Sequence, residues 1–156
     1  IKLRYSDNAD ALFAAELQNR RALLTTELFL DGQPIKVQYS GLDMGKIESA
    51  FDGDLETVIL TYEANPLRIH MDFPQSRGLS QVTAYAGGTP SRLTVTLYPP
   101  DGGAPHLFSV DGDESPVVRP LSVQFDHFNA AGLQIELLNI RDGEPAHVHL
   151  WEVIFE

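Results

Sequence analysis

The stretch that governs the fold of this chain is AFDGDLET at residues 50–57, which is followed by PLRIHMDF at residues 66–73. Gly53 permits a tight turn, so the carboxylates of Asp52 and Asp54 can gather around one point together with carbonyl groups that turn inward. In residues 66–73 apolar and polar residues alternate, which is the pattern of a strand with one buried and one solvent-facing side. An oxygen-rich turn therefore precedes a half-buried strand.

Strands of the same kind are predicted through the rest of the chain. Residues 93–98 alternate in the same way, and turn-forming sequences such as AGGTP at 86–90 and PPDGG at 99–103 separate the apolar segments. Short, regularly spaced strands joined by such turns are typical of an all-β sandwich or barrel. Further strands are expected at residues 80–85, 106–110, 121–125, 133–140 and 148–155.

The N-terminal part of the chain has a different pattern. Leu12, Phe13 and Leu17 recur at roughly helical intervals among Ala, Glu, Gln and Arg, which predicts a helix. The next residues form two apolar segments around DGQP at 31–34, which predicts a hairpin.

No internal repeat or low-complexity tract divides the sequence. We expect residues 1–156 to form a single domain, with a helical lead-in at about residues 1–24 and a β-sandwich at about residues 25–156.

Composition limits the class of partner. The 156 residues include 22 Asp and Glu against 11 Lys and Arg, and the formal net charge of -11 repels nucleic acid and anionic lipid surfaces alike. The absence of cysteine excludes disulfides and thiolate chemistry. No apolar run is long enough to span a bilayer, and Ile1 carries no leader, so we expect no membrane insertion by these residues and covalent attachment to a larger protein.

Together these segments resemble the galactose-binding-like superfamily, which includes discoidin (F5/8 type C) domains and carbohydrate-binding modules. The resemblance rests on the loop at residues 50–57, the strand at 66–73, the central strand LTVTLY at 93–98 and the closing strand HLWEV at 149–153. It covers about residues 47–156. It implies a jelly-roll β-sandwich that is non-catalytic and extracytoplasmic, and that binds carbohydrate or glycan.

The same resemblance implies a structural Ca²⁺ held by the loop and by the Glu of the last strand. These positions correspond here to Asp52, Asp54, Thr57 and Glu152. An aromatic residue often follows the Thr in the superfamily, whereas this chain has Val58. The alternative is a loop without metal, in which the Asp and Thr side chains only hydrogen-bond the turn.

A sugar site needs polar groups that fix the hydroxyls and an apolar or aromatic surface for the ring. In the superfamily such groups lie on loops at one end of the sandwich. The candidates on the corresponding loops of this chain are His106, Phe108, Arg119, His127 and Asn129.

Two further features of the closing strand are interpreted as structural. His147 and His149 lie two residues apart and share one side of the predicted strand, but no third ligand accompanies them as a zinc site requires. Trp151 falls on the same side and is expected to pack in the sandwich.

No pattern of a catalytic site is present. The sequence has no Gly-x-Ser-x-Gly elbow, no His-Glu-x-x-His helix and no Gly-rich phosphate loop. Asp111, Asp113 and Glu114 could imitate the paired carboxylates of a glycosidase, but the glycine between the first two and the Ser-Pro that follows favour an exposed turn.

Three functions stay open at this point. The first is the accessory domain that binds carbohydrate or glycan. The second is a structural or protein-interaction domain without a sugar site, attached to a membrane glycosyltransferase-like protein, since domains of this kind also trail some bacterial polytopic glycosyltransferases. The third is a small hydrolase on a jelly-roll scaffold, which would need a cleft with convergent titratable groups.

Overall fold

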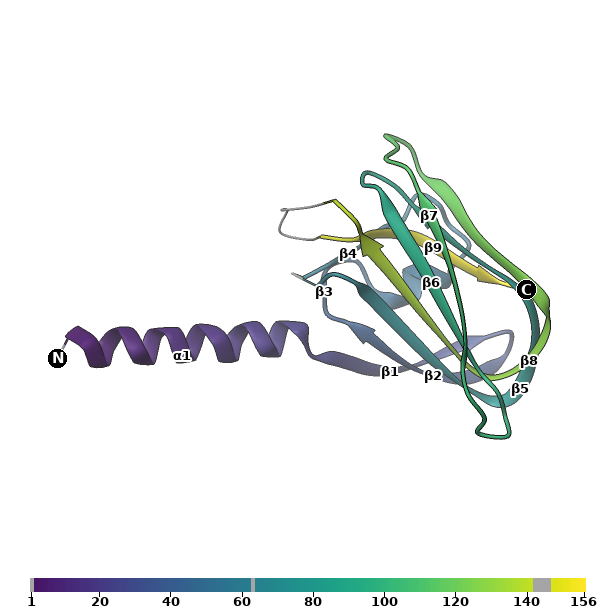
Figure 1. Cartoon of the computed structure of the whole chain (residues 1–156), viewed down its shortest axis with the longest axis horizontal. Helices are drawn as coiled ribbons and strands as arrows, with labels where there is room; N and C mark the ends of the chain where they lie inside the picture. The colour runs from purple at the N-terminus through teal and green to yellow at the C-terminus, as the bar shows by residue number, and fades with distance from the viewer. Residues whose placement is uncertain (1, 63, 142–146) are drawn as a thin grey trace.

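The computed structural model describes residues 2–62, 64–141 and 147–156, and strands make up most of the regular structure (Figure 1). The described residues contain one α-helix, α1 (Lys2–Arg21), and one short 3-10 helix, η1 (Ile47–Phe51). The strands are β1 (Leu23–Leu30), β2 (Gln33–Ser40), β3 (Leu42–Met44), β4 (Ile59–Thr61), β5 (Leu67–Ala86), β6 (Ser91–Tyr98), β7 (His106–Gly112), β8 (Arg119–Asn139) and β9 (His149–Phe155).

Two long antiparallel strands, β5 and β8, belong to both layers of the molecule. Residues 67–72 of β5 pair with β2 and with the second half of β8, which continues to β6 and β7. The second half of β5 pairs with the first half of β8 and with β9, which continues to β4 and β3. The two layers thus read β1-β2-β5-β8-β6-β7 and β3-β4-β9-β5-β8. The fold is the expected jelly-roll β-sandwich.

The predicted strands at 67–73 and 80–85 are one continuous strand, and so are those at 121–125 and 133–140. The alternation is interrupted between them because both strands bend there. The pairing register of β5 with β8 shifts between Asp72 and Arg77 and again between Leu79 and Gln81. Pro74 lies in this bend, where it has no backbone N–H to donate to the ladder.

The core lies between the layers and is built from the alternating apolar residues. Residues 67, 69, 71 and 73 are at most 8% exposed, and Leu93, Val95 and Leu97 are fully buried. Full burial of each such side chain contributes about 1.5–3 kcal/mol relative to exposure. The alternation thus correctly identified the buried side of both strands.

The predicted hairpin is formed by β1 and β2. Its turn consists of Asp31 and Gly32, which both have positive φ, 52° and 74°. Two consecutive residues of this conformation form the tight turn whose twist matches that of the flanking strands.

The helix α1 leads away from the sandwich, as Figure 1 shows. Leu12 and Phe13 are 71% and 67% exposed, so the apolar positions that predicted the helix are not part of the core. No helix in the described part of the chain has the length and apolar character needed to cross a bilayer.

Trp151 corrects one expectation. Its neighbours on β9, Leu150 and Glu152, are buried, whereas Trp151 is only half-buried and lies outside the core cluster. Successive side chains of a strand point to opposite sides, so burying Leu150 turns Trp151 outward, where its ring lies 6.1 Å from that of His149.

Candidate functional site

The loop that follows η1 is organised by its own side chains. Asp52 Oδ1 accepts a hydrogen bond from the backbone N–H of Asp54 (2.9 Å), and Asp54 Oδ1 accepts one from that of Glu56 (2.9 Å). Gly53 has φ +77°, a conformation that glycine adopts without strain. The buried side chains of Ile47 and Ala50 anchor η1 beneath this loop.

Thr57 closes the loop and gathers oxygen atoms around its hydroxyl. Thr57 Oγ1 lies 3.0 Å from the carbonyl of Asp54, 3.4 Å from that of Ser49 and 3.3 Å from Asp52 Oδ2. Carboxylate, hydroxyl and carbonyl oxygens are the donors that a hard cation such as Ca²⁺ prefers.

Glu152 reaches the same loop from β9. Glu152 is only 4% exposed, and its Oε2 accepts a hydrogen bond from the Gly53 N–H (3.1 Å). Burial raises the pKa of Glu152 to about 7, Asp52 and Asp54 act in the same direction, and the Gly53 hydrogen bond opposes them. A buried carboxylate next to two further carboxylates is a charge arrangement that a cation would stabilise.

The structure thus places the four predicted metal ligands around one loop. Their chemistry fits a hard cation, but no group of three Asp, Glu, His or Cys side chains in the described residues forms a metal cage by itself. Backbone carbonyls such as those of Ser49 and Asp54 would have to complete the coordination.

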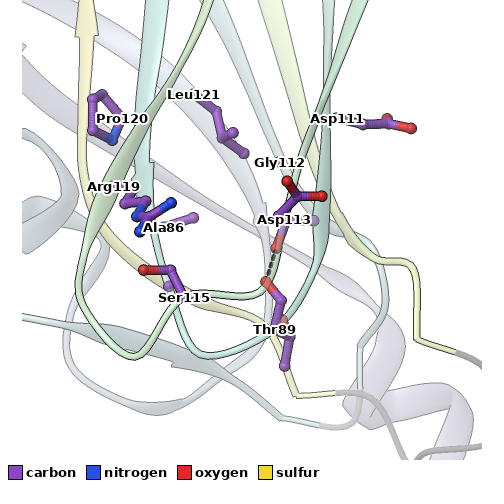
Figure 2. A pocket seen from close by; sticks show the side chains of 11 residues that line it. Ala86, Thr89, Asp111, Gly112, Asp113, Ser115, Arg119, Pro120 and Leu121 are labelled. Carbon is purple, nitrogen blue, oxygen red and sulfur yellow. Dashed lines mark hydrogen bonds between the residues drawn. The ribbon is translucent and has the colours of Figure 1, made fainter.

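A cavity of about 260 Å³ lies elsewhere, where the β5–β6 and β7–β8 connections meet (Figure 2). Ser115, which is 2% exposed, joins these connections because its carbonyl accepts a hydrogen bond from the Gly88 N–H (2.9 Å). The lining residues are Ala86, Gly87, Thr89, Ser91, Asp111, Gly112, Asp113, Ser115, Arg119, Pro120 and Leu121.

Three charged residues line this cavity, and they are not equivalent. Asp111 is paired with Arg92, whose guanidinium donates hydrogen bonds of 2.7 and 2.9 Å. That bond lowers the pKa of Asp111 and raises that of Arg92. Arg119 forms no ion pair with any described residue. Figure 2 shows Arg119 and Asp113 on either side of the hollow.

The other predicted sugar ligands lie away from Arg119. The ring of His106 is 4.8 Å from that of Phe128, and Phe108 stacks on Phe125 at 5.1 Å. Both contacts join a residue of β7 to a residue of β8. In these contacts His106 is exposed and Phe108 is half-buried, and neither lines the cavity that contains Arg119, so the five predicted ligands do not lie around one cavity.

The two remaining candidates lie near the bend of β8. The ring of His127 packs over Gly78, where an added Cβ would come within 2.4 Å of His127 Cε1. Asn129, paired with Gly78, is exposed. Neither residue lines the cavity that contains Arg119.

Of the two histidines, only His149 lies on β9, whereas His147 precedes it, and they form no metal-binding group with other described residues. His147 Nδ1 lies 3.1 Å from the carbonyl of Thr61, and His149 Nδ1 is buried without a hydrogen-bond partner in the described residues. Burial lowers the pKa of His149, and the neighbouring His147 lowers it further. A structural role fits both residues better than metal binding.

No protein-family model and no curated protein sequence matches the chain. Solved structures do match it. The family 32 carbohydrate-binding module of NanJ from C. perfringens, in complex with galactose, has a TM-score of 0.59 and 15% identity over 85% of this chain and 98% of the module. The family 32 module of AlyQ, in complex with 4,5-unsaturated mannuronic acid, has a TM-score of 0.58 and 18% identity over 85% and 98%. The chain has the fold of these modules.

The same fold occurs inside a larger enzyme. A GH29 fucosidase of Ruminococcus gnavus, in complex with fucose, matches with a TM-score of 0.61 and 16% identity over 78% of this chain. This chain corresponds to only 25% of that protein. Identities this low establish a shared architecture, and the binding residues have to be argued from this chain.

Sequence reasoning missed most of the cavity. Asp111, Asp113 and Glu114 are exposed, as predicted for this turn, but the sequence did not indicate that Asp113 also lines a cavity, and Thr89 and Ser115 were not singled out. The turn-forming residues at 86–90 and 111–116 predict two connections between strands. No sequence pattern within either connection shows that the two lie side by side. That proximity follows from the strand order, in which β6 lies between β8 and β7.

Proposed function

We propose that this chain is a non-catalytic carbohydrate-binding domain whose ligand occupies the cavity beside Arg119. The fold supports this proposal because modules of the same architecture have been solved with bound sugars. Arg119 indicates where the ligand binds. Its guanidinium has no ion-pair partner in the described residues and lines a cavity of about 260 Å³ together with other polar groups.

The lining suits a sugar ring. Arg119 can donate two parallel hydrogen bonds to adjacent hydroxyls, and the Asp113 carboxylate can accept them from other hydroxyls. Ala86, Pro120 and Leu121 offer apolar surface to the C–H groups of the ring. The cavity volume is slightly below the lower end of the common range for small-molecule sites, about 300–1,000 Å³, which favours a single sugar unit over a long chain.

Catalysis is not part of this proposal. A glycosidase needs two carboxylates free to act as acid and base or nucleophile. Asp111 is held by Arg92, which leaves Asp113 as the remaining carboxylate of the cavity lining. The hydrolase alternative is tested by activity on a panel of glycosides, where we expect none.

Binding to a glycan array, followed by calorimetry with the best ligand, tests the proposal. Arg119→Ala should weaken binding at least tenfold, about 1.4 kcal/mol, because it removes the charge-assisted hydrogen bonds. Arg68→Ala is the matched control, since Arg68 is a half-buried arginine paired with Glu136 outside the cavity. A folded protein that binds no glycan, or an Arg119→Ala variant that binds as well as the parent, would refute the proposal.

An interaction domain without a sugar site is the alternative. It is favoured by the absence of any aromatic side chain from the cavity lining, since sugar sites commonly use one as a platform. The glycan array separates the two functions. Neither of the modules described above supports a glycosyltransferase context. An extracytoplasmic location and attachment to a larger protein remain part of this proposal, and the fucosidase, of which this chain corresponds to 25%, is an example of the fold within a larger protein.

We also propose that the loop at residues 52–57 binds Ca²⁺ with the help of Glu152. A ligand at one hundred times its Kd stabilises the folded state by about 2.7 kcal/mol, so Ca²⁺ should raise the Tm by about 5–10 °C over protein in chelator. Glu152→Gln should abolish this increase because the amide carries no charge. An equal Tm in Ca²⁺ and in chelator would contradict the site.

A further inference from the structure

Arg119 differs from the other arginines of the sandwich. Each of the others described within residues 22–156 forms an ion pair with a carboxylate of the chain. The pairs are Arg68–Glu136, Arg77–Asp31, Arg92–Asp111 and Arg141–Glu114. The chain has 22 Asp and Glu against 11 Lys and Arg, so carboxylates that could accept from a guanidinium are in excess. Arg119 has no such partner among the described residues, which leaves its guanidinium available to a carboxylate from outside the chain.

The other charges around the cavity are compensated within the chain, with one exception. Asp111 accepts two hydrogen bonds from Arg92, and Glu114 pairs with Arg141. The exception is Asp113, which has no ion-pair partner among the described residues. Because acidic side chains outnumber basic ones in this chain, an exposed carboxylate without a cation is the expected case. The unpaired guanidinium is the unusual group of the cavity, and it indicates the charge of the ligand.

The backbone that carries both charged groups is fixed on each side of the cavity. Arg119 belongs to the ladder between β5 and β8. The wall that contains Asp113 is joined to the β5–β6 connection, because the Ser115 carbonyl accepts a hydrogen bond from the Gly88 N–H. The Ser115 hydroxyl also accepts a hydrogen bond from the Val117 N–H (3.3 Å). A site whose walls are preorganised in this way selects a ligand that matches the positions of both groups.

We propose that the ligand of this cavity is an acidic sugar, namely a hexuronic acid whose carboxylate pairs with Arg119 and whose ring hydroxyls donate to Asp113. This assignment rests on the proposed function and specifies its ligand class. A guanidinium binds a carboxylate through two parallel charge-assisted hydrogen bonds, which are stronger than its bonds to neutral hydroxyls.

The shape of a hexuronic acid agrees with the placement of the two groups. In its pyranose ring the carboxylate on C5 lies across the ring from the hydroxyl on C2. One ring therefore presents an anion on one side and hydroxyl donors on the other. Figure 2 shows Arg119 and Asp113 in the corresponding positions, on either side of the hollow. The ligand carboxylate is thus kept apart from the Asp113 carboxylate, which it would repel at close range.

Pairs of ligands that differ only in charge test this assignment. The probes are the methyl glycosides of glucuronic, galacturonic, mannuronic and guluronic acid, each compared with its C6 methyl ester by NMR titration of the whole chain. The ester keeps the ring and the other hydroxyls but removes the charge. We expect at least one of the acids to bind at least tenfold more tightly than its ester.

Substitution of Arg119 shows whether this preference comes from the guanidinium. Arg119→Gln removes the charge, so the acid and its ester should bind to this variant with equal affinity. Arg119→Lys keeps the charge but not the paired donors, so it should retain only part of the preference. Arg68→Gln is the matched control, since Arg68 lies outside the cavity, and it should retain the full preference.

The outcomes separate this assignment from the proposed function. Equal binding of every acid and its ester by the parent, a preference that persists in Arg119→Gln, or tighter binding of the corresponding amino sugars would overturn the acidic ligand. The proposed function would still stand in these cases if Arg119→Ala weakened binding of a neutral or amino sugar. A folded chain that binds no glycan of any charge would refute both.

Discussion

Glu152 combines a structural and an electrostatic role at the level of a single residue. Its carboxyl group accepts a hydrogen bond from the Gly53 N–H. It is also buried next to Asp52, and both the burial and the neighbouring carboxylate raise the free energy of the ionised form. Resemblance to known sandwiches pointed to this residue from the sequence. Its burial and its raised pKa follow from the position of β9 beneath the loop, which no local pattern encodes.

The raised pKa of Glu152 predicts a pH dependence of stability in chelator. The folded protein keeps the proton up to about pH 7, whereas the unfolded chain releases it near 4.5, so the folded state binds more protons between these values. Protonated Glu152 therefore makes its full contribution to the free energy of unfolding below pH 4.5. This contribution, at most about 3 kcal/mol, is lost as the pH rises to about 7.

Denaturant unfolding of the parent and of Glu152→Gln at pH 5 and pH 7.5 checks this prediction. The parent should lose more stability than the variant on going to pH 7.5, because His149 and all other groups contribute equally to both. Saturating Ca²⁺ should restore the parent at pH 7.5 and leave the variant unchanged. Identical pH dependence in the two proteins would show that Glu152 does not titrate in this range.

At the level of elements, the short connection from β3 to η1 depends on Gly45. Its φ is +83°, and an added Cβ would lie 2.6 Å from the carbonyl oxygen of Val58 and 2.9 Å from a side-chain carbon of Ile59. Gly45→Ala should therefore destabilise the fold by about 2–4 kcal/mol, through backbone strain of about 1–2 kcal/mol and a clash with backbone that cannot move freely.

Gly88→Ala separates the two causes. Gly88 has nearly the same φ, +84°, but no atom lies within 4 Å of the added Cβ, so only the strain of about 1–2 kcal/mol should remain. Denaturant midpoints of both variants measure the difference. Equal losses would mean that the close approach to Val58 is relieved at little cost.

The elements also show what a sequence pattern can and cannot predict. Alternation identified the buried sides of β5 and β6, and the turn-forming residues 31–34 predicted the hairpin, of which Asp31 and Gly32 form the turn, because these features depend on neighbouring residues. It divided β5 and β8 into separate strands, since a bend breaks alternation without ending the strand. It also could not predict the cavity at Arg119, whose other groups come from connections distant in sequence.

At the level of the whole molecule, the sandwich and α1 are expected to be independent in stability. The exposed Leu12 and Phe13 contribute little to the core, so removal of residues 1–21 should change the free energy of unfolding by less than about 1 kcal/mol, or about 2–4 °C in Tm. Thermal unfolding of the shortened chain measures this. A larger decrease would show that the helix packs on the sandwich in solution.

The most direct test of the carbohydrate-binding account is an NMR titration of the whole chain with the best ligand from the glycan array. The account predicts that amide shifts concentrate in residues 86–91 and 111–121, which form the cavity, and that Arg119→Ala suppresses them. Shifts confined to other parts of the sandwich, or shifts of equal size in Arg119→Ala, would contradict it.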